Sequence, residues 1–540
     1  MGISPDGNTA YLAAWGVATC KYNGVHVVDI ADPAKPREVS FIPSKEGSYP
    51  GEGVQALSVS TPAFTGDILH QQRDLQGQGR VRRHEHLRRD QAVASHAARG
   101  GRRGHHRQRP GQEGRQRDSQ RLRLGRRRQA YAVIVDNEEG KDVDILDITD
   151  PRNPELIAEY DLDMMFPQIK QAAPSNLIEI FLHDMVVKEI GGKQVMMLSY
   201  WDAGYVKIDV TNPLIPTYIA DTDFTNPDPL AKERGLGDVP PEGNGHQAEF
   251  TADDEYVVGA DEDFAPYALL TKNVTDGTDI NASQGSGTRK LTDGEEITGP
   301  SVFVGRACLG DAAVPPGGAG TQIAVVERGV CTFTEKVASV IAAGGYEAVL
   351  VFNREGSGGC GTPLSMSVQG DIPAFGVAPR AQGFALFNAA YNNTACLAGD
   401  GTKLSGIPIG TAGDTLTFSS YFDGWGYVHL FKNTGGKMAE LDTYAIPEAH
   451  DPAFADGFGD LSVHEVATSR ADDRLLYFSY YSGGFRVARI TPEEKIEEVG
   501  RFIDDDGSDI WGVEVFSDAN KEYVAASDRN SGLVILKYAP

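Results

Sequence analysis

The sequence predicts a mainly β protein, in which a repeated antiparallel sheet is interrupted by one inserted α/β domain. A short phrase recurs along the 540 residues: GVHVVDIADPAKP at 24–36, DVDILDITDPRNP at 142–154 and GYVKIDVTNPLIP at 204–216. Each copy is a turn residue, a run of strand-forming residues, an acidic residue and a proline-containing turn. A strand that leads into the same turn each time is typical of a stacked repeat and not of a catalytic motif.

The acidic residue and the prolines of the phrase have a structural explanation. Proline fixes φ and disfavours a helical conformation of the residue before it, so it ends the strand and directs the chain outward. We expect the acidic side chain to cap the turn by accepting from backbone amides.

A partner strand precedes each copy, and the two together predict a β-propeller. Examples of the partner strand are NTAYLAAW (8–15), QAYAVIVDN (129–137), KQVMMLSYW (193–201), TLTFSSYF (415–422), RLLYFSYYS (474–482) and KEYVAASD (521–528). Antiparallel strands joined by short turns at a period near 60 residues fit propeller blades. The strand-closing positions in this frame are 29, 147, 209, 431, 489 and 537.

Residues 69–128 differ in composition from the rest of the chain. They hold 18 Arg but no Lys, no Ile and no aromatic residue. Codons for Arg82–Ala92 can be chosen so that the same bases, read one base later, encode GGMNIYDVTKP. This is the repeat phrase again, and its strand-closing aspartate falls near position 88. We interpret 69–128 as a frameshifted, non-native or disordered segment that replaces part of a seventh blade. The nucleotide sequence tests this, and a gene without compensating insertions or deletions would contradict it.

Two alternatives for this segment depend on its being real protein. One is a basic disordered arm for acidic partners, and the other is a nucleic-acid-binding arm. The whole chain carries a formal charge of −26, which repels nucleic acid and anionic membrane surfaces, so we predict no nucleic-acid partner.

The repeat phrases resemble the LVIVD repeat of bacterial secreted and surface proteins. The resemblance covers about 1–265 and 413–540, apart from 69–128, and implies a seven-bladed β-propeller in an extracellular or cell-surface setting. The chain opens with MGISPDGNTAYLAAWG, which is similar to the interior of a blade. We infer that the start is truncated and that a signal sequence was lost with it. The sequence contains no apolar run of 18 or more residues, so we predict no transmembrane segment.

An inserted domain is predicted at about 266–412, because 222 residues separate positions 209 and 431. IAVVERG reads as an apolar strand, and Thr332-x-x-Glu335 as a capping box that begins a helix with Val337, Val340 and Ile341 on one face. The phrases IAVVERGVCTFTEK, AAGGYEAVLVFN and IPAFGV resemble the core of the protease-associated (PA) domain over about 297–400. That resemblance implies a lid or a peptide- or protein-binding module.

Four of the five cysteines lie in this insert, and four cysteines allow three pairings. Nearest-neighbour order together with the PA resemblance favours Cys308–Cys331 and Cys360–Cys396. The wide spacing disfavours a zinc site. Disulfides indicate an oxidising compartment, and Cys20 has no predicted partner in this frame.

Three histidines begin blades and are the candidate metal ligands. His183 and His464 lie 26 and 25 residues before their strand-closing positions, and Trp511 holds the matching place in the last blade. We expect His183, His246, His464 and Glu249, with Asp184 and Glu465 nearby, to line the mouth of the central channel. Imidazole with carboxylate suits a divalent metal. The alternative, in which these histidines make hydrogen bonds between blades, stays open.

An acidic stretch is the candidate calcium loop. Asp504, Asp506 and Asp509, with Gly507 between them, have the oxygen density of such a loop but not the spacing of an EF-hand. The alternative is a solvated turn.

No protease or phosphate-binding motif is present. The sequence has no H-E-x-x-H, no G-x-S-x-G and no G-x-x-x-x-G-K-S/T. It therefore predicts a non-enzymatic scaffold that binds a protein, peptide or extracellular polymer through the PA insert and the channel mouth. The alternative is a metal-dependent hydrolase that uses the histidine and carboxylate cluster. No cofactor is assigned beyond a divalent metal or calcium, and no oligomeric state is predicted.

Overall fold

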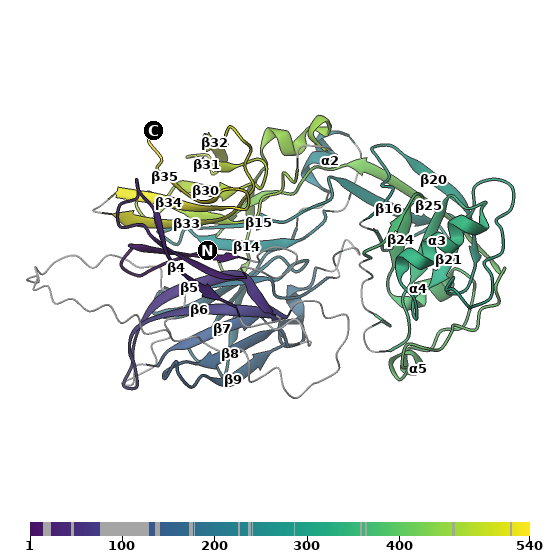
Figure 1. The fold of residues 1–540 in the computed structure, drawn as a ribbon, viewed down its shortest axis with the longest axis horizontal. Helices are drawn as coiled ribbons and strands as arrows, with labels where there is room; N and C mark the ends of the chain where they lie inside the picture. The colour runs from purple at the N-terminus through teal and green to yellow at the C-terminus, as the bar shows by residue number, and fades with distance from the viewer. Residues whose placement is uncertain are drawn as a thin grey trace, which may run out of the picture. The chain divides into compact units, whose positions relative to one another are not determined.

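The structure is a computed structural model that forms two compact units (Figure 1). It describes residues 1–14, 23–44, 48–75, 129–135, 141–171, 177, 179–224, 227–235, 239, 241–285, 287–356, 359–361, 364, 366–455, 459–518 and 521–540. The first unit comprises Met1–Lys232, Gly237–Phe264 and Trp425–Pro540, and the second comprises Glu233–Leu236 and Ala265–Gly424. Cys20 and most of 69–128 lie outside the described residues.

The first unit is a propeller-like ring of antiparallel sheets. Among the described residues of this unit, six sheets have three or more strands. They are β1 (Gly2–Ile3), β2 (Thr9–Ala14), β3 (Gly24–Asp29) and β4 (Arg37–Pro43); β7 (Tyr131–Val135), β8 (Val143–Asp147) and β9 (Glu155–Tyr160); β10 (Asp184–Ile190), β11 (Lys193–Ser199), β12 (Tyr205–Asp209) and β13 (Thr217–Asp221), extended by β27 (Gly436–Lys437); β14 (Gly245–Phe250), β15 (Tyr256–Asp261), β26 (Val428–Lys432) and β28 (Glu440–Tyr444); β29 (Val466–Thr468), β30 (Leu475–Ser479), β31 (Phe485–Ile490) and β32 (Ile496–Phe502); and β33 (Ile510–Asp518), β34 (Lys521–Asp528) and β35 (Gly532–Leu536).

A two-stranded hairpin accompanies these sheets. β5 (Ser48–Ser60) pairs with β6 (Thr65–Leu75), and its Val59 and Ile68 share a core with the β7 sheet. The predicted seventh blade is not confirmed, because residues 76–128 lie outside the described part of the chain. The mainly β class and the propeller-like arrangement agree with the prediction.

Apolar cores join neighbouring sheets around the ring. The β7 and β10 sheets share Val143, Leu198 and neighbouring side chains, and the β14 and β29 sheets share a core around Val428 and Phe478. The first and last sheets meet through Leu12 and Phe516, so in Figure 1 the purple N-terminal strands lie beside the yellow C-terminal strands.

The first strands of five sheets, β1, β10, β14, β29 and β33, form the inner wall of this ring. Each is the edge strand from which its sheet begins, and β10 contacts β14, β14 contacts β29, β29 contacts β33 and β33 contacts β1.

The acidic residue of each repeat caps its turn, as predicted. The carboxylates of Asp29, Asp147 and Asp209 each accept from the backbone amide two residues later, at 3.1, 2.8 and 2.9 Å. These aspartates are therefore structural, and the repeat phrase itself carries no site chemistry.

Among its described residues, the first unit also contains five short helical segments: α1 (Leu162–Met165), α2 (Pro229–Glu233) and 3-10 turns at Pro167–Ile169, Pro447–His450 and Pro452–Phe454. No helix in the described part of the chain is long and apolar enough to span a membrane.

The second unit is built on one eight-stranded sheet. Its order is β17 (Thr278–Asp279), β16 (Tyr267–Asn273), β25 (Ala412–Phe422), β20 (Glu296–Phe303), β21 (Ile323–Glu327), β22 (Ala348–Phe352), β24 (Ala374–Val377) and β18 (Ala282–Gln284). The helices are α3 (Phe333–Ala343), α4 (Arg380–Ala385) and α5 (Asn393–Leu397), and β19 (Gly287–Thr288) pairs with β23 (Gln369–Gly370). β20, β21, β22 and β24 run parallel, with α3 between β21 and β22, as the predicted strand-helix-strand unit requires.

The segment TLTFSSYF departs from its predicted place. It was expected to be a propeller strand, but it lies in β25 and pairs with β16 and β20 of the second unit. The alternation of apolar and polar residues predicted a strand correctly, but it could not specify the sheet that the strand joins. The interrupted propeller sheet resumes at β26, which pairs with β15 across the insertion.

The start of α3 differs in one detail from the predicted capping box. The Thr332 hydroxyl accepts from the Glu335 amide at 3.2 Å, but the Glu335 carboxylate accepts from the Leu309 amide at 2.8 Å and does not complete the box. Val337 and Val340 are fully buried, whereas Ile341 is 39% exposed.

Both predicted disulfides are present. Cys308 bonds to Cys331 and Cys360 bonds to Cys396, with Cα–Cα distances of 5.7 and 6.0 Å.

A buried histidine between two carboxylates is expected to make the stability of the first unit depend on pH. His429 Nε2 lies 2.5 Å from Asp261 and Nδ1 lies 2.5 Å from Glu440. Burial alone lowers the pKa of His429, but the two carboxylates outweigh it and raise the pKa from 6.5 to about 10. This contribution is complete below pH 6.5 and is lost as the pH rises through 10.

We therefore expect the free energy of unfolding to fall by several kcal/mol between pH 6.5 and 10 in the wild type. The check is urea unfolding across this pH range, followed by tryptophan fluorescence. His429→Gln is expected to be less stable at pH 6.5 and to show a flatter pH dependence. An equal slope in both proteins would contradict the assignment.

Candidate functional site

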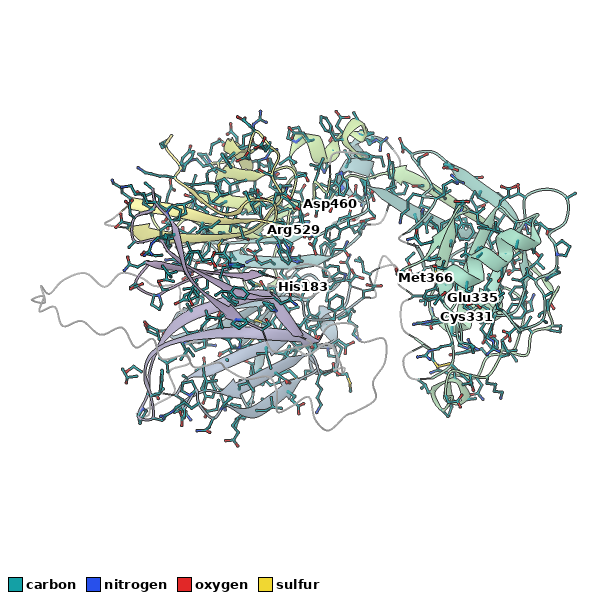
Figure 2. All side chains as sticks on the ribbon, in the orientation of Figure 1. His183, Cys331, Glu335, Met366, Asp460 and Arg529 are labelled. Carbon is teal, nitrogen blue, oxygen red and sulfur yellow. A yellow bond between two sulfur atoms is a disulfide. The ribbon has the colours of Figure 1, made fainter. Side chains whose placement is uncertain are left out.

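The candidate site lies where the first strands of four consecutive sheets begin. His183 immediately precedes β10, His246 lies on β14, His464 lies two residues before β29, and Trp511 is on β33. These are corresponding positions in successive sheets, so the geometry of the repeat brings together residues that are far apart in the sequence. His183 is labelled in Figure 2.

The rings of these residues form a continuous series of contacts. Ring centroids lie 4.0 Å apart for His183 and His246, 4.3 Å for His246 and His464, and 5.1 Å for His464 and Trp511. At the other end, Trp201 lies 5.4 Å from His183 and 5.1 Å from Phe181. The predicted convergence of the three histidines is thus observed, while their role as metal ligands stays a prediction.

Glu262 is the carboxylate that joins this cluster. Its Oε2 lies 3.3 Å from His246 Nε2 and its Oε1 lies 3.6 Å from His464 Nε2. The Tyr481 hydroxyl donates to Oε1. Ligand atoms of His183, His246 and Glu262 all lie within 4.8 Å of one another. We call these three residues, with His464, Tyr481 and Trp511, the histidine cluster.

Glu262 was not predicted as a site residue, because in the sequence it is only one member of the acidic run 261–263. A usable signal was present in the repeat. Trp201, Glu262 and Tyr481 each lie just after the second strand of a sheet. Trp201 and Tyr481 form isolated β-bridges to Gly245 and Ile510, at the start of the next first strand. This position therefore points toward the inner wall.

Glu249 stays a predicted ligand that the grouping of side chains does not include. It lies on β14, outside the group of His183, His246 and Glu262, and its charge acts on Asp184. Burial raises the pKa of Asp184 to about 7, and the negative charges of Glu465 and Glu249 add to that effect. Burial also raises the pKa of Glu465, whose Oε2 accepts from the Val513 amide at 2.9 Å. These three carboxylates surround the cluster without forming part of it.

Burial and the neighbouring imidazoles of His246 and His183 lower the pKa of His464 well below its usual value. His464 is therefore neutral at physiological pH. Its Nε2 accepts from the indole N–H of Trp511, which can only donate.

A cation and two carboxylates border the cluster. The Arg529 guanidinium lies 5.6 Å from the Trp511 ring and 6.0 Å from the Tyr481 ring. Burial raises the pKa of Asp460 and of Asp509, and the charge of Arg529 opposes that rise in both. Asp460 and Arg529 are labelled in Figure 2.

The predicted calcium residues lie in a turn that is held by hydrogen bonds between its own residues. The Asp506 amide donates to Asp504 at 3.0 Å, and the Asp504 amide donates to Ser508 at 3.0 Å. Asp509 faces Arg529 at 3.7 Å. Two groups of described residues bring three possible metal-ligand atoms close together, and neither group contains these aspartates. Calcium binding therefore stays a prediction.

The second such group does not suit a metal. It consists of Cys308, Cys331 and Glu335, and its sulfurs are joined in a disulfide. No thiolate is available there, and a thiolate is what binds metal.

Comparisons with known proteins identify one domain of the chain. Residues 297–386 match the PA domain family, so the chain contains a PA domain within its second unit. A comparison with curated proteins returned no match.

Among solved structures, the chain is similar to a zinc aminopeptidase from Bacillus subtilis, with 19% identity and a TM-score of 0.21, over 33% of this chain and 36% of that one. It is also similar to an aminopeptidase from Aneurinibacillus sp. strain AM-1, with 17% identity and a TM-score of 0.19, over the same shares. The chain therefore spans about a third of the length of these structures.

Proposed function

We propose that the protein is an extracytoplasmic, non-enzymatic binding scaffold. The propeller-like ring, of the LVIVD-repeat type, presents Trp511 and Arg529, beside the largely buried histidine cluster, as one binding surface, and the PA domain presents a second. The ligand class is a protein, a peptide or an extracellular polymer. The two disulfides support an oxidising compartment.

One observation carries this proposal: consecutive sheets bring rings and charged groups together at the start of their first strands. Trp201, the histidines, Trp511 and Arg529 follow one another from the β10 sheet to the β33 sheet. Aromatic side chains and arginine are the residues that contribute most to binding energy at protein interfaces.

The ring is proposed to have seven blades in its native form. The β5–β6 hairpin would supply two strands of the second blade, and a native-frame version of 69–128 would supply the remaining strands there and the first strand of the β7 sheet. Support comes from the spacing of positions 29, 147 and 209 in the sequence, which leaves room for one more copy near 88.

Binding at the cluster is tested by selection from a random peptide library and from a panel of soluble polysaccharides. Trp511→Ala and Arg529→Ala are expected to weaken the selected probe about tenfold or more, as truncation at interface hot spots does. Arg501, which lies on the outer strand β32 and is 57% exposed, supplies the matched control Arg501→Ala. A selected probe that binds all variants equally would contradict the assignment of the cluster.

A second candidate function, metal-dependent hydrolysis, is favoured by the closeness of His183, His246 and Glu262. Two histidines and a glutamate are a known ligand set of catalytic zinc. Hydrolysis of peptide substrates by the zinc-loaded wild type, and its loss in Glu262→Gln, would favour this candidate over the scaffold.

A further inference from the structure

We infer that His183, His246 and Glu262 bind one divalent ion of the zinc type, with His464 and Tyr481 as positioning residues outside the ligand set. The metal site itself is independent of the proposed function. Only the ligand that the ion would bind rests on that proposal. The three side chains come from the β10 and β14 sheets, and their ligand atoms lie within 4.8 Å of one another. Two imidazole nitrogens and one carboxylate oxygen suit a borderline divalent metal.

The orientation of His246 is fixed by a hydrogen bond to the backbone. Its Nδ1 lies 2.8 Å from the carbonyl oxygen of His464, and because a carbonyl can only accept, Nδ1 carries the proton. In the neutral ring the lone pair is then on Nε2, which is the atom 3.3 Å from Glu262. Metal-binding histidines are oriented in this way by a carbonyl or carboxylate on the other nitrogen.

Glu262 is fixed in a comparable way. Tyr481 donates to Oε1, while Oε2 faces His246. The glutamate is only 7% exposed, so its charge is costly to bury unless a cation or several donors compensate for it. A divalent ion between Oε2 and the two imidazoles would add to the stabilisation that Tyr481 and the histidines already give this carboxylate.

His464 differs from the other two histidines. Its Nε2 accepts from Trp511, and that contact uses the lone pair that a metal would need. Its backbone carbonyl holds His246 instead. The structure therefore points to three protein ligands rather than the four residues predicted from sequence, and it replaces Glu249 with Glu262.

A three-ligand site leaves one coordination position for a water molecule or for a ligand oxygen. The ion would bind a carboxylate or hydroxyl of the ligand that the scaffold holds. Peptide termini, acidic side chains and the hydroxyls of a polymer all carry such oxygens, so one chemistry serves the proposed ligand classes.

The test is metal titration of the full chain without any other ligand. Metal-stripped wild type is loaded with Co²⁺, and its visible absorption is followed, while calorimetry with Zn²⁺ gives the stoichiometry. We expect one site in the wild type that disappears in His183→Ala and in Glu262→Gln. The glutamine variant keeps the shape of the side chain and can still accept from Tyr481, so its fold is expected to be retained, as near-UV circular dichroism would show.

Further variants separate ligands from positioning residues. Tyr481→Phe is expected to bind Zn²⁺ about tenfold or more weakly, as loss of an outer contact does, and His464→Ala is expected to keep one site. His26→Ala, at a partly exposed histidine paired with Glu38, is the control and should match the wild type. All variants contain the same histidines in 69–128. Any weak Zn²⁺ binding to these histidines is therefore the same in every variant and does not affect the comparison.

Retention of the site in both His183→Ala and Glu262→Gln would overturn the inference, as would a wild type that binds no metal stoichiometrically. Loss in His464→Ala with retention in Glu262→Gln would favour the four-residue set and also overturn it. A metal-free protein that still binds its selected peptide or polysaccharide contradicts only the metal site. A metal-loaded protein that selects no probe contradicts only the proposed function.

Discussion

Replacing Arg380 with leucine is expected to lower the free energy of unfolding of the second unit by about 3–5 kcal/mol, the usual cost of removing one partner from a buried ion pair. Arg380 begins α4 and donates to the carboxylate of Glu327 and to the carbonyl of Asn353. Its guanidinium also lies 5.3 Å from the Phe352 ring. The side chains of Arg380 and Glu327 are only 4% and 1% exposed, so the variant leaves a buried carboxylate without its cation.

The measurement is differential scanning calorimetry alongside tryptophan fluorescence. All four tryptophans lie outside 265–424, so unfolding of the second unit is the transition without a fluorescence change. Arg289→Leu is the matched control, because Arg289 and Glu295 form an exposed pair at 2.6 Å and such pairs contribute at most about 1 kcal/mol. Equal effects of Arg380→Leu and Arg289→Leu would contradict the role assigned to the buried pair.

Removing the Cys360–Cys396 disulfide is expected to cost about 4 kcal/mol, because a cross-link of this span restricts the unfolded chain. The two cysteines are 36 residues apart in sequence, and those of the other disulfide are 23 apart. Cys308→Ala/Cys331→Ala is therefore expected to cost slightly less, about 3 kcal/mol. Alanine is chosen as the replacement because Cys360 and Cys396 are both buried. A serine hydroxyl at these positions would lower the free energy of unfolding further, because burying a polar group is unfavourable.

Thermal unfolding of both double variants and of the reduced wild type measures these effects. The reduced wild type is expected to lose at least as much stability as either double variant. A second-unit transition that is unchanged in Cys360→Ala/Cys396→Ala would contradict the assigned contribution.

Much of the fold could be predicted because the signals were local. The capping role of the acidic residue before Asp-Pro or Asn-Pro depends only on the residues of the same turn, so it can be predicted from the local sequence. Asp29, Asp147 and Asp209 cap their turns as expected. The PA domain was predicted from contiguous phrases, and residues 297–386 match that family. The disulfide pairs followed from order along the chain together with the resemblance.

Features that depend on contacts between distant segments were harder to predict. The β25 strand has the same alternating pattern as a propeller strand, and only its partners place it in the second unit. Glu335 bonds to Leu309, 26 residues away, in preference to the helix that it begins.

The candidate site shows both outcomes. The three histidines were found because the repeat gives each first strand a corresponding position, and equal positions in a ring face one another. Glu262 was missed because it comes from a turn after the second strand, in a sheet that the insertion interrupts. Glu249 was expected among the carboxylates at the channel mouth, and it lies outside the group formed by His183, His246 and Glu262.

The most direct measurement is an anomalous difference map at the zinc absorption edge, from crystals of the full chain grown with Zn²⁺. We predict one strong peak at coordination distance, about 2.0–2.2 Å, from a His183 ring nitrogen, His246 Nε2 and a carboxylate oxygen of Glu262, with His464 still accepting from Trp511. A map without a peak there, or with Zn²⁺ bound to His464 and Glu249 instead, would contradict a binding site assembled in this way from consecutive sheets.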